Sequence, residues 1–176
     1  AEARLLIDRL ASRQRVAVSE EAKDLLTQQF GCSAFFITTF LQAAREKNNS
    51  LLSYLDCERL YVDELLGGRL QSHFADLLEE IAPTTDLRLA VVRLLWESIA
   101  GDQRVASFEA CRRRLHVKGE DMEGILQQLH IQEFVNWDGS LVEFADGPQA
   151  WKDYLKTRYR LIVMNEPRAL VGGYFF

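Results

Sequence analysis

The sequence predicts a mainly α fold that contains one β-hairpin, and three observations support this prediction. Serine or threonine residues that can cap a helix precede several helix-like stretches of the chain. The segment FVNWDGSLVEF (134–144) places two runs rich in aromatic and β-branched residues around Asp138-Gly139, a dipeptide that favours a two-residue hairpin turn. Apolar residues also recur at helical spacings of three and four, as in Leu70, Phe74, Leu78 and Ile81.

The first half of the chain is predicted to be helical throughout. Ser19 is the expected N-cap of a helix that ends at Gly31, and Ser33 is the expected N-cap of the next one. Gly67-Gly68 interrupts the following helical pattern, and Pro83 ends the last one, because proline cannot continue a helix. The helices are expected over 3–10, 20–30, 34–47, 51–66 and 69–82, with a polar link over 13–18.

The segment PTTD (83–86) is the clearest internal boundary, and it separates an expected first domain, 1–83, from a second, 84–166. A C-terminal tail, 167–176, follows. The second half is expected to contain a nearly all-apolar core helix, two shorter helices, the hairpin and a final helix that begins at Pro148, over 87–100, 107–115, 119–130, 132–144 and 148–163.

This order of elements is that of a winged-helix domain, in which the hairpin is the wing. The hairpin is then expected to cover the end of a small helical core. Val135 and Trp137 share one face of their strand, and Val142 and Phe144 are expected to meet them across the pair.

Composition places the chain among ordinary globular proteins. It has 176 residues, of which 48% are hydrophobic and 27% are charged. The sequence contains neither a long apolar stretch nor a signal-peptide pattern, so we expect a cytoplasmic protein with no membrane partner. Its three cysteines, Cys32, Cys57 and Cys111, are expected to be reduced and mostly buried. The chain begins without Met and ends in an apolar run, which suggests a piece of a longer protein; a processed mature chain is the alternative.

The distribution of charge argues against reading of DNA by the third helix and the hairpin. The net charge is −5, and phosphate contacts require cations. Acidic residues are found on both elements: Glu120, Asp121, Glu123, Glu133, Asp138, Glu143 and Asp146. Basic residues are found on the second and last helices of this half instead: Arg112, Arg113, Arg114, Lys152, Lys156 and Arg158. These six residues form either a solvated charged face or a docking surface for an acidic partner or nucleic acid.

Motifs that carry chemistry are not found in the sequence. It has no G-x-x-x-x-G-K-S/T phosphate loop, and His73, His116 and His130 are too far apart to suggest a metal site. No histidine–acid arrangement that would activate a thiol accompanies Cys111. We therefore expect no enzymatic activity, metal or cofactor in this chain by itself. An unrecognised enzyme is kept as a third hypothesis.

Two stretches carry a resemblance to a known family. FGCSAFFITTFLQAAREKNNSLL (30–52) resembles the segment around the glycine-proline motif in the helical lid of AAA+/STAND-type P-loop ATPases, particularly the archaeal-type ATPase family. WKDYLKTRYR (151–160) is similar to the end of the winged helix that follows such a lid. The order of a helical lid followed by a winged helix matches the chain from about Leu5 to Glu166.

The resemblance implies that a nucleotide-binding domain precedes this chain in a parent protein, where ATP and Mg²⁺ would bind next to the lid. Gly31, Cys32, Ser33 and Ala34 would then lie near the nucleotide. Gly31 matches the first glycine of the motif, whereas Cys32 and Ala34 replace its second glycine and its proline. The chain would be a non-catalytic regulatory or interaction region that couples nucleotide state to a protein partner or to self-association. The alternative is a winged-helix DNA-binding regulator that uses its basic helix faces.

Overall fold

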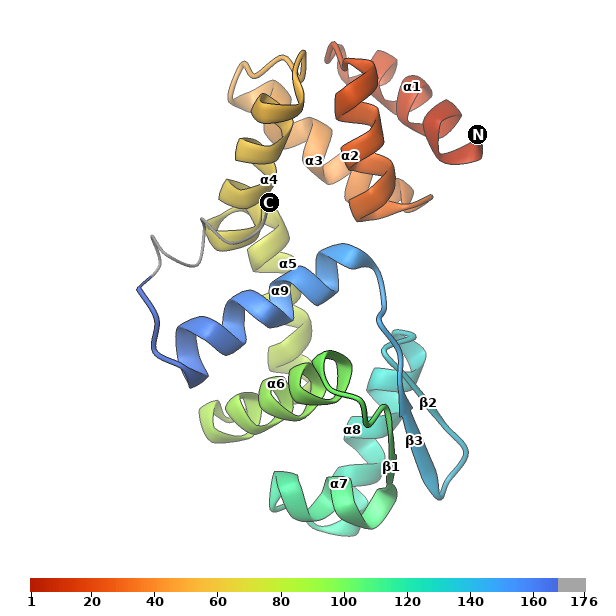
Figure 1. Ribbon diagram of the computed structural model, residues 1–176, viewed down its shortest axis with the longest axis vertical. Coiled ribbons are helices and arrows are strands. Elements are labelled where there is room, and N and C mark those ends of the chain that lie inside the picture. The colour runs from red at the N-terminus through yellow and green to blue at the C-terminus, as the bar shows by residue number, and fades with distance from the viewer. Residues whose placement is uncertain (168–176) are drawn as a thin grey trace. The chain divides into compact units, whose positions relative to one another are not determined.

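The computed structural model describes residues 1–167 (Figure 1). The predicted mainly α fold with a small antiparallel β region is confirmed. The chain forms two compact units: the first comprises Ala1–Phe74 and Pro148–Tyr154, and the second comprises Ala75–Gly147 and 155–167. This division falls inside a helix rather than after Pro83, and the predicted domains 1–83 and 84–166 stay predictions. The predicted tail, 167–176, lies outside the described residues except for Pro167.

The first unit is helical. It contains α1 (Glu2–Gln14), α2 (Glu20–Phe30), α3 (Ala34–Glu46), α4 (Tyr54–Gly67), the start of α5 (Arg69–Ile81) and the start of α9 (Gln149–Arg158). The predicted caps are confirmed, because the hydroxyl groups of Ser19 and Ser33 accept hydrogen bonds from Ala22 N (3.1 Å) and Phe36 N (3.3 Å). Gly31 ends α2 with a φ of 56°, a value that favours glycine.

Two predicted boundaries in the first unit are wrong. The first helix runs to Gln14 rather than Leu10, because Ala11 continues its buried stripe and Arg15 ends it in the left-handed conformation. The fourth helix begins at Tyr54 rather than Leu51. Leu51 instead forms a β-bridge with Val18, so a backbone contact between distant residues takes the place of a helical turn.

Aromatic side chains form the centre of the first unit. α1 packs on α2 and α3, and α2 packs on α3 and α4. The ring of Phe30 lies 5.9 Å from Phe36, 5.5 Å from Phe40 and 5.8 Å from Tyr61. Buried Tyr61 also donates a 2.7 Å hydrogen bond from its hydroxyl group to Asp153, so the polar end of this ring is satisfied within the core.

The second unit combines helices with a three-stranded sheet. It contains the end of α5, α6 (Thr85–Ala100), β1 (Val105–Ser107), α7 (Phe108–Leu115), α8 (Gly119–Ile131), β2 (Val135–Trp137), β3 (Leu141–Phe144), the end of α9 and a π-helical turn, η1 (Tyr159–Val163). Thr84 caps α6 and Ser107 caps α7, through hydrogen bonds of 3.3 and 3.1 Å. The predicted last helix, 148–163, therefore changes to a π-helical turn after Arg158.

The hairpin strands pair as the sequence predicts, with Val135 opposite Phe144 and Trp137 opposite Val142. The strand β1 was not predicted. It pairs antiparallel with β3 and gives the order β1-β3-β2 (Figure 1). Three residues are too few to show an alternating pattern, and its partner strand lies beyond α7 and α8 in the sequence.

The hairpin turn is displaced by one residue from the prediction. Trp137 pairs with Val142, and Asp138 N–H donates to Leu141 O (3.4 Å), so the two central residues are Gly139 and Ser140. Gly139 supplies the positive φ, 101°. Asp138 supports the turn from outside, because its carboxylate accepts from the backbone N–H groups of Leu141 and Ser140, both at 2.9 Å. These bonds lower the pKa of Asp138.

Within residues 1–167, no helix combines the length and apolar character that crossing a bilayer requires.

Candidate functional site

The predicted nucleotide-adjacent residues form the turn between α2 and α3. Gly31 and Cys32 are exposed, Ser33 is half-buried as the cap of α3, and Ala34 is the exposed first residue of that helix. All four residues therefore lie at the short connection between α2 and α3. Their proximity to a nucleotide stays a prediction.

The three cysteines differ in accessibility. Cys32 is exposed, whereas Cys57 and Cys111 are buried. Burial, followed by the charge of Asp56, raises the pKa of the Cys57 thiol to about 12. Burial also raises the pKa of Cys111, although the charge of Arg114 opposes that rise.

We expect Cys32 alone to react rapidly with Ellman's reagent in the native protein, because only its thiol is accessible. Cys57 and Cys111 should react only when local opening or unfolding exposes them, and therefore more slowly. Counting the thiols released with time, with and without urea, measures this. Cys32→Ser should abolish the fast phase, and a fast phase that persists in this variant would contradict the burial of the other two thiols.

The three arginines of α7 do not form one uniform basic face. Arg112 Nε donates to both carboxylate oxygens of Glu109 at 3.0 Å. Arg113 is largely exposed and lies 3.9 Å from Glu109. Arg114 instead reaches α6 and pairs with Glu97. The arginines thus have different environments, although they are consecutive in the sequence.

The basic residues of α9 are divided between the two units. Lys152 belongs to the first unit, and Lys156 and Arg158 belong to the second. All three side chains are half-buried. A docking role for these residues stays a prediction. Among the described residues, no group of three or more His, Cys, Asp or Glu side chains is arranged to hold a metal ion.

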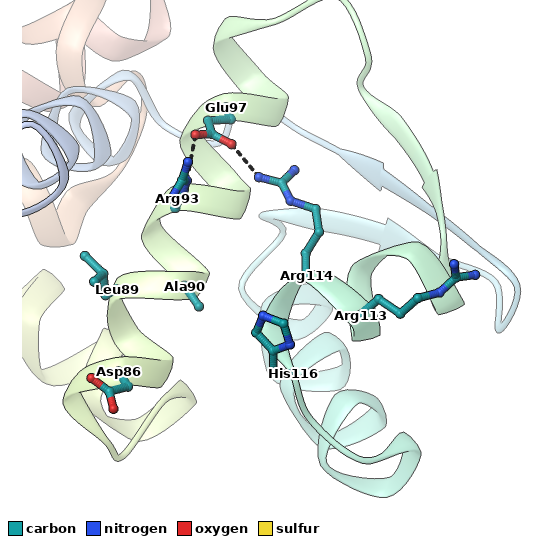
Figure 2. A pocket seen from close by; sticks show the side chains of 8 residues that line it. All are labelled: Asp86, Leu89, Ala90, Arg93, Glu97, Arg113, Arg114 and His116. Atoms are coloured by element: carbon teal, nitrogen blue, oxygen red, sulfur yellow. Dashed lines mark hydrogen bonds and ion pairs between the residues drawn. The ribbon is translucent and has the colours of Figure 1, made fainter.

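An open groove of about 700 Å³ lies between α6 and α7 in the second unit (Figure 2). Its lining includes the apolar side chains of Leu89 and Ala90. Residues along α6 recur at spacings of three and four, so they form one face of that helix. The residues that line the groove are Asp86, Leu89, Ala90, Arg93, Glu97, Arg113, Arg114 and His116.

Glu97 is the centre of the charged network in this groove. One carboxylate oxygen accepts from Arg93 Nε (3.0 Å) and from the Tyr159 hydroxyl group (3.2 Å), and the other accepts from Arg114 Nη2. Figure 2 shows Arg93 and Arg114 converging on Glu97, whereas Arg113 points away from α6. One carboxylate therefore links α6, α7 and η1.

Hydrogen bonding controls the ionisation of Glu97. Burial alone would raise its pKa, but hydrogen bonds from Arg93 and Tyr159 and the charge of Arg114 outweigh burial, so the pKa is lowered. The nearly all-apolar pattern of residues 87–100 did not single out Arg93 or Glu97. Their spacing of four could have indicated an ion pair, but the contacts with Arg114 and Tyr159 depend on tertiary packing.

Because the pKa of Glu97 is lowered in the folded protein, this carboxylate stabilises the fold above its unfolded-state value of about 4.5 and loses that effect as the pH falls further. Wild type should therefore exceed Glu97→Gln in unfolding free energy near pH 7, and the gap should close in acid. Urea unfolding of both proteins across this range measures it. Glu123→Gln, at an exposed position on α8, is the control, and a gap that widens in acid would contradict the prediction.

No family model matches this chain, and no curated protein or solved structure matches it either.

Proposed function

We propose that this chain is a non-catalytic interaction region of a P-loop ATPase, composed of a helical lid and a winged helix. In this proposal it couples the nucleotide state of an upstream domain to a cytoplasmic protein partner. Two features support it: the lid-like segment 30–52, and the order of helices and strands from α6 to α9 with the hairpin after the third helix. The resemblance supplies the ATPase part of the proposal.

The observation that favours a protein partner over DNA is the surface charge of α8 and the hairpin. A winged helix that reads DNA inserts its third helix and wing into the duplex grooves. In this chain the carboxylates on these elements are exposed: Glu120, Asp121, Glu123, Glu133, Asp138 and Glu143. They would repel the phosphate backbone. Residues 119–144 also contain no Lys or Arg that could offset this repulsion.

Duplex binding is the direct test of the alternative. We expect no saturable change in the fluorescence anisotropy of a labelled duplex at about 50 mM salt, because phosphate contacts need cations and residues 119–144 contain no Lys or Arg. Micromolar binding that collapses at about 200 mM salt would contradict this expectation and favour the DNA-binding regulator. Arg113→Glu, which changes the most exposed arginine of α7, should then weaken binding.

The ATPase part of the proposal is tested by the coding sequence upstream of Ala1. We expect a G-x-x-x-x-G-K-S/T motif between a predicted strand and a helix in the parent protein. An upstream region without that motif would overturn the proposal.

A further inference from the structure

We propose that Arg93 and Arg114, held together by Glu97, form a binding site for a carboxylate of a short acidic and apolar peptide segment in a protein partner. This inference rests on the proposed function as an interaction region and identifies the surface and the chemistry of its partner. The groove between α6 and α7 is the site (Figure 2).

The first argument is the arrangement of the two guanidinium groups. Arg93 and Arg114 come from different helices and contact opposite oxygens of the same carboxylate. Two adjacent guanidinium groups would repel each other without it. Glu97 neutralises one of the two positive charges, so the three side chains together carry a net charge of +1. A second carboxylate, from a partner, would neutralise the remaining charge.

The second argument is unused hydrogen-bonding capacity. A guanidinium group has five N–H donors. Arg93 uses Nε and Arg114 uses Nη2, and neither makes any other hydrogen bond or ion pair within residues 1–167. Their side chains are 60% and 43% exposed, so the remaining donors are accessible. Two such groups suit a carboxylate, which can accept from both at once.

The third argument is the apolar surface beside the arginines. Leu89 precedes Arg93 by four residues on α6 and is 38% exposed, and Ala90 lies next to it in the groove. Asp86 lies at the end of this row. The site therefore suits an apolar side chain next to one carboxylate. It suits a continuous phosphate backbone poorly, because Asp86 would repel the next phosphate.

The experiment is a titration of the full 176-residue chain, observed through arginine Nε–Hε resonances. The probe is a capped pentapeptide, Ala-Leu-Asp-Leu-Ala, and its control has Asn in place of Asp. We expect the Arg93 and Arg114 resonances to shift with a Kd on the order of 10⁻⁴–10⁻³ M, because exposed ion pairs contribute little each. The Asn peptide should bind at least about fivefold more weakly.

Two single substitutions on α7 provide the matched comparison. Arg114→Ala should weaken peptide binding about fivefold or more, whereas Arg112→Ala should leave it unchanged, because Arg112 lies outside the lining of the groove and pairs with Glu109. Arg93→Ala should resemble Arg114→Ala. Dispersed backbone spectra of each variant confirm that it folds.

Several outcomes would overturn the inference. These are unshifted Arg93 and Arg114 resonances at millimolar peptide, equal binding of the Asn peptide, and equal loss in Arg112→Ala and Arg114→Ala. Duplex DNA that displaces the peptide, or self-association that Arg114→Ala abolishes, would assign the groove to another occupant and overturn it as well. If the peptide does not bind but a P-loop lies upstream, this inference fails and the proposed function stands. If the peptide binds but no P-loop lies upstream, the ATPase part of the proposed function fails and the peptide site stands.

Discussion

Trp151→Ala is expected to lower the free energy of unfolding by about 3–5 kcal/mol, the usual range when a large aromatic side chain is removed from a core. Trp151 is completely buried in the first unit. Its ring lies 5.3 Å from the ring of Phe74 and stacks at 5.8 Å on Tyr154. Alanine cannot fill this space, so the substitution removes the contacts and leaves a cavity.

Urea unfolding followed by circular dichroism measures this change. The control is Trp137→Ala, because Trp137 is only half-buried and stacks on Phe108 at 6.1 Å. It should lower the free energy of unfolding by roughly 1–2 kcal/mol. Equal losses of unfolding free energy in the two variants would contradict the prediction that fully buried Trp151 contributes more to stability than half-buried Trp137.

Gly68→Ala is expected to destabilise the protein by about 2–4 kcal/mol, through steric overlap and the loss of a helix cap. A Cβ at this position would lie 2.3 Å from Glu64 Oε2 and 2.8 Å from Glu64 Cα. The side chain could move, but the backbone atom cannot. The displaced carboxylate is buried, accepts a hydrogen bond from Arg69 N (2.7 Å) and pairs with Lys47 Nζ (3.0 Å).

The matched control for this substitution is Gly124→Ala. Gly124 lies within α8, and a Cβ there meets no atom within 4 Å. Alanine should therefore stabilise the protein by about 0.5–1 kcal/mol, as expected for a helix interior. Thermal unfolding of both variants gives opposite shifts in Tm. A Gly68→Ala protein as stable as wild type would contradict the close approach of Glu64.

Local signals in the sequence predicted most of the helices. Serine caps begin α2, α3 and α7. Each hydroxyl group accepts a hydrogen bond from the backbone N–H three residues later, so a few neighbouring residues are enough to predict the start of the helix. The pairing of the hairpin strands followed from alternating apolar residues in the same way. The turn itself lies one residue later than predicted, with Gly139 and Ser140 at its centre. Asp138 lies just before the turn, where its carboxylate accepts hydrogen bonds from Ser140 and Leu141.

Long-range contacts could not be predicted in this way. Nothing in the sequence around Glu64 indicates that its carboxylate caps α5 from the preceding helix. Glu97 and Arg114 are separated by a strand and most of a helix, and only the packing of α6 on α7 joins them. The six basic residues, predicted to form a solvated charged face or a docking surface, were identified from their positions in the sequence. Arg93, the partner of Arg114 at the groove, was therefore missed.

The strand β1 has a consequence for the order in which the second unit folds. The β2–β3 hairpin is local and can form within microseconds. Val105 pairs with Glu143, so β1 can join only after the chain that contains α7 and α8 has closed into a loop, which is entropically unfavourable. During synthesis, β1 leaves the ribosome before β3 does. It must remain unpaired until β3 is available, so the strand that is made first is the last to join the sheet.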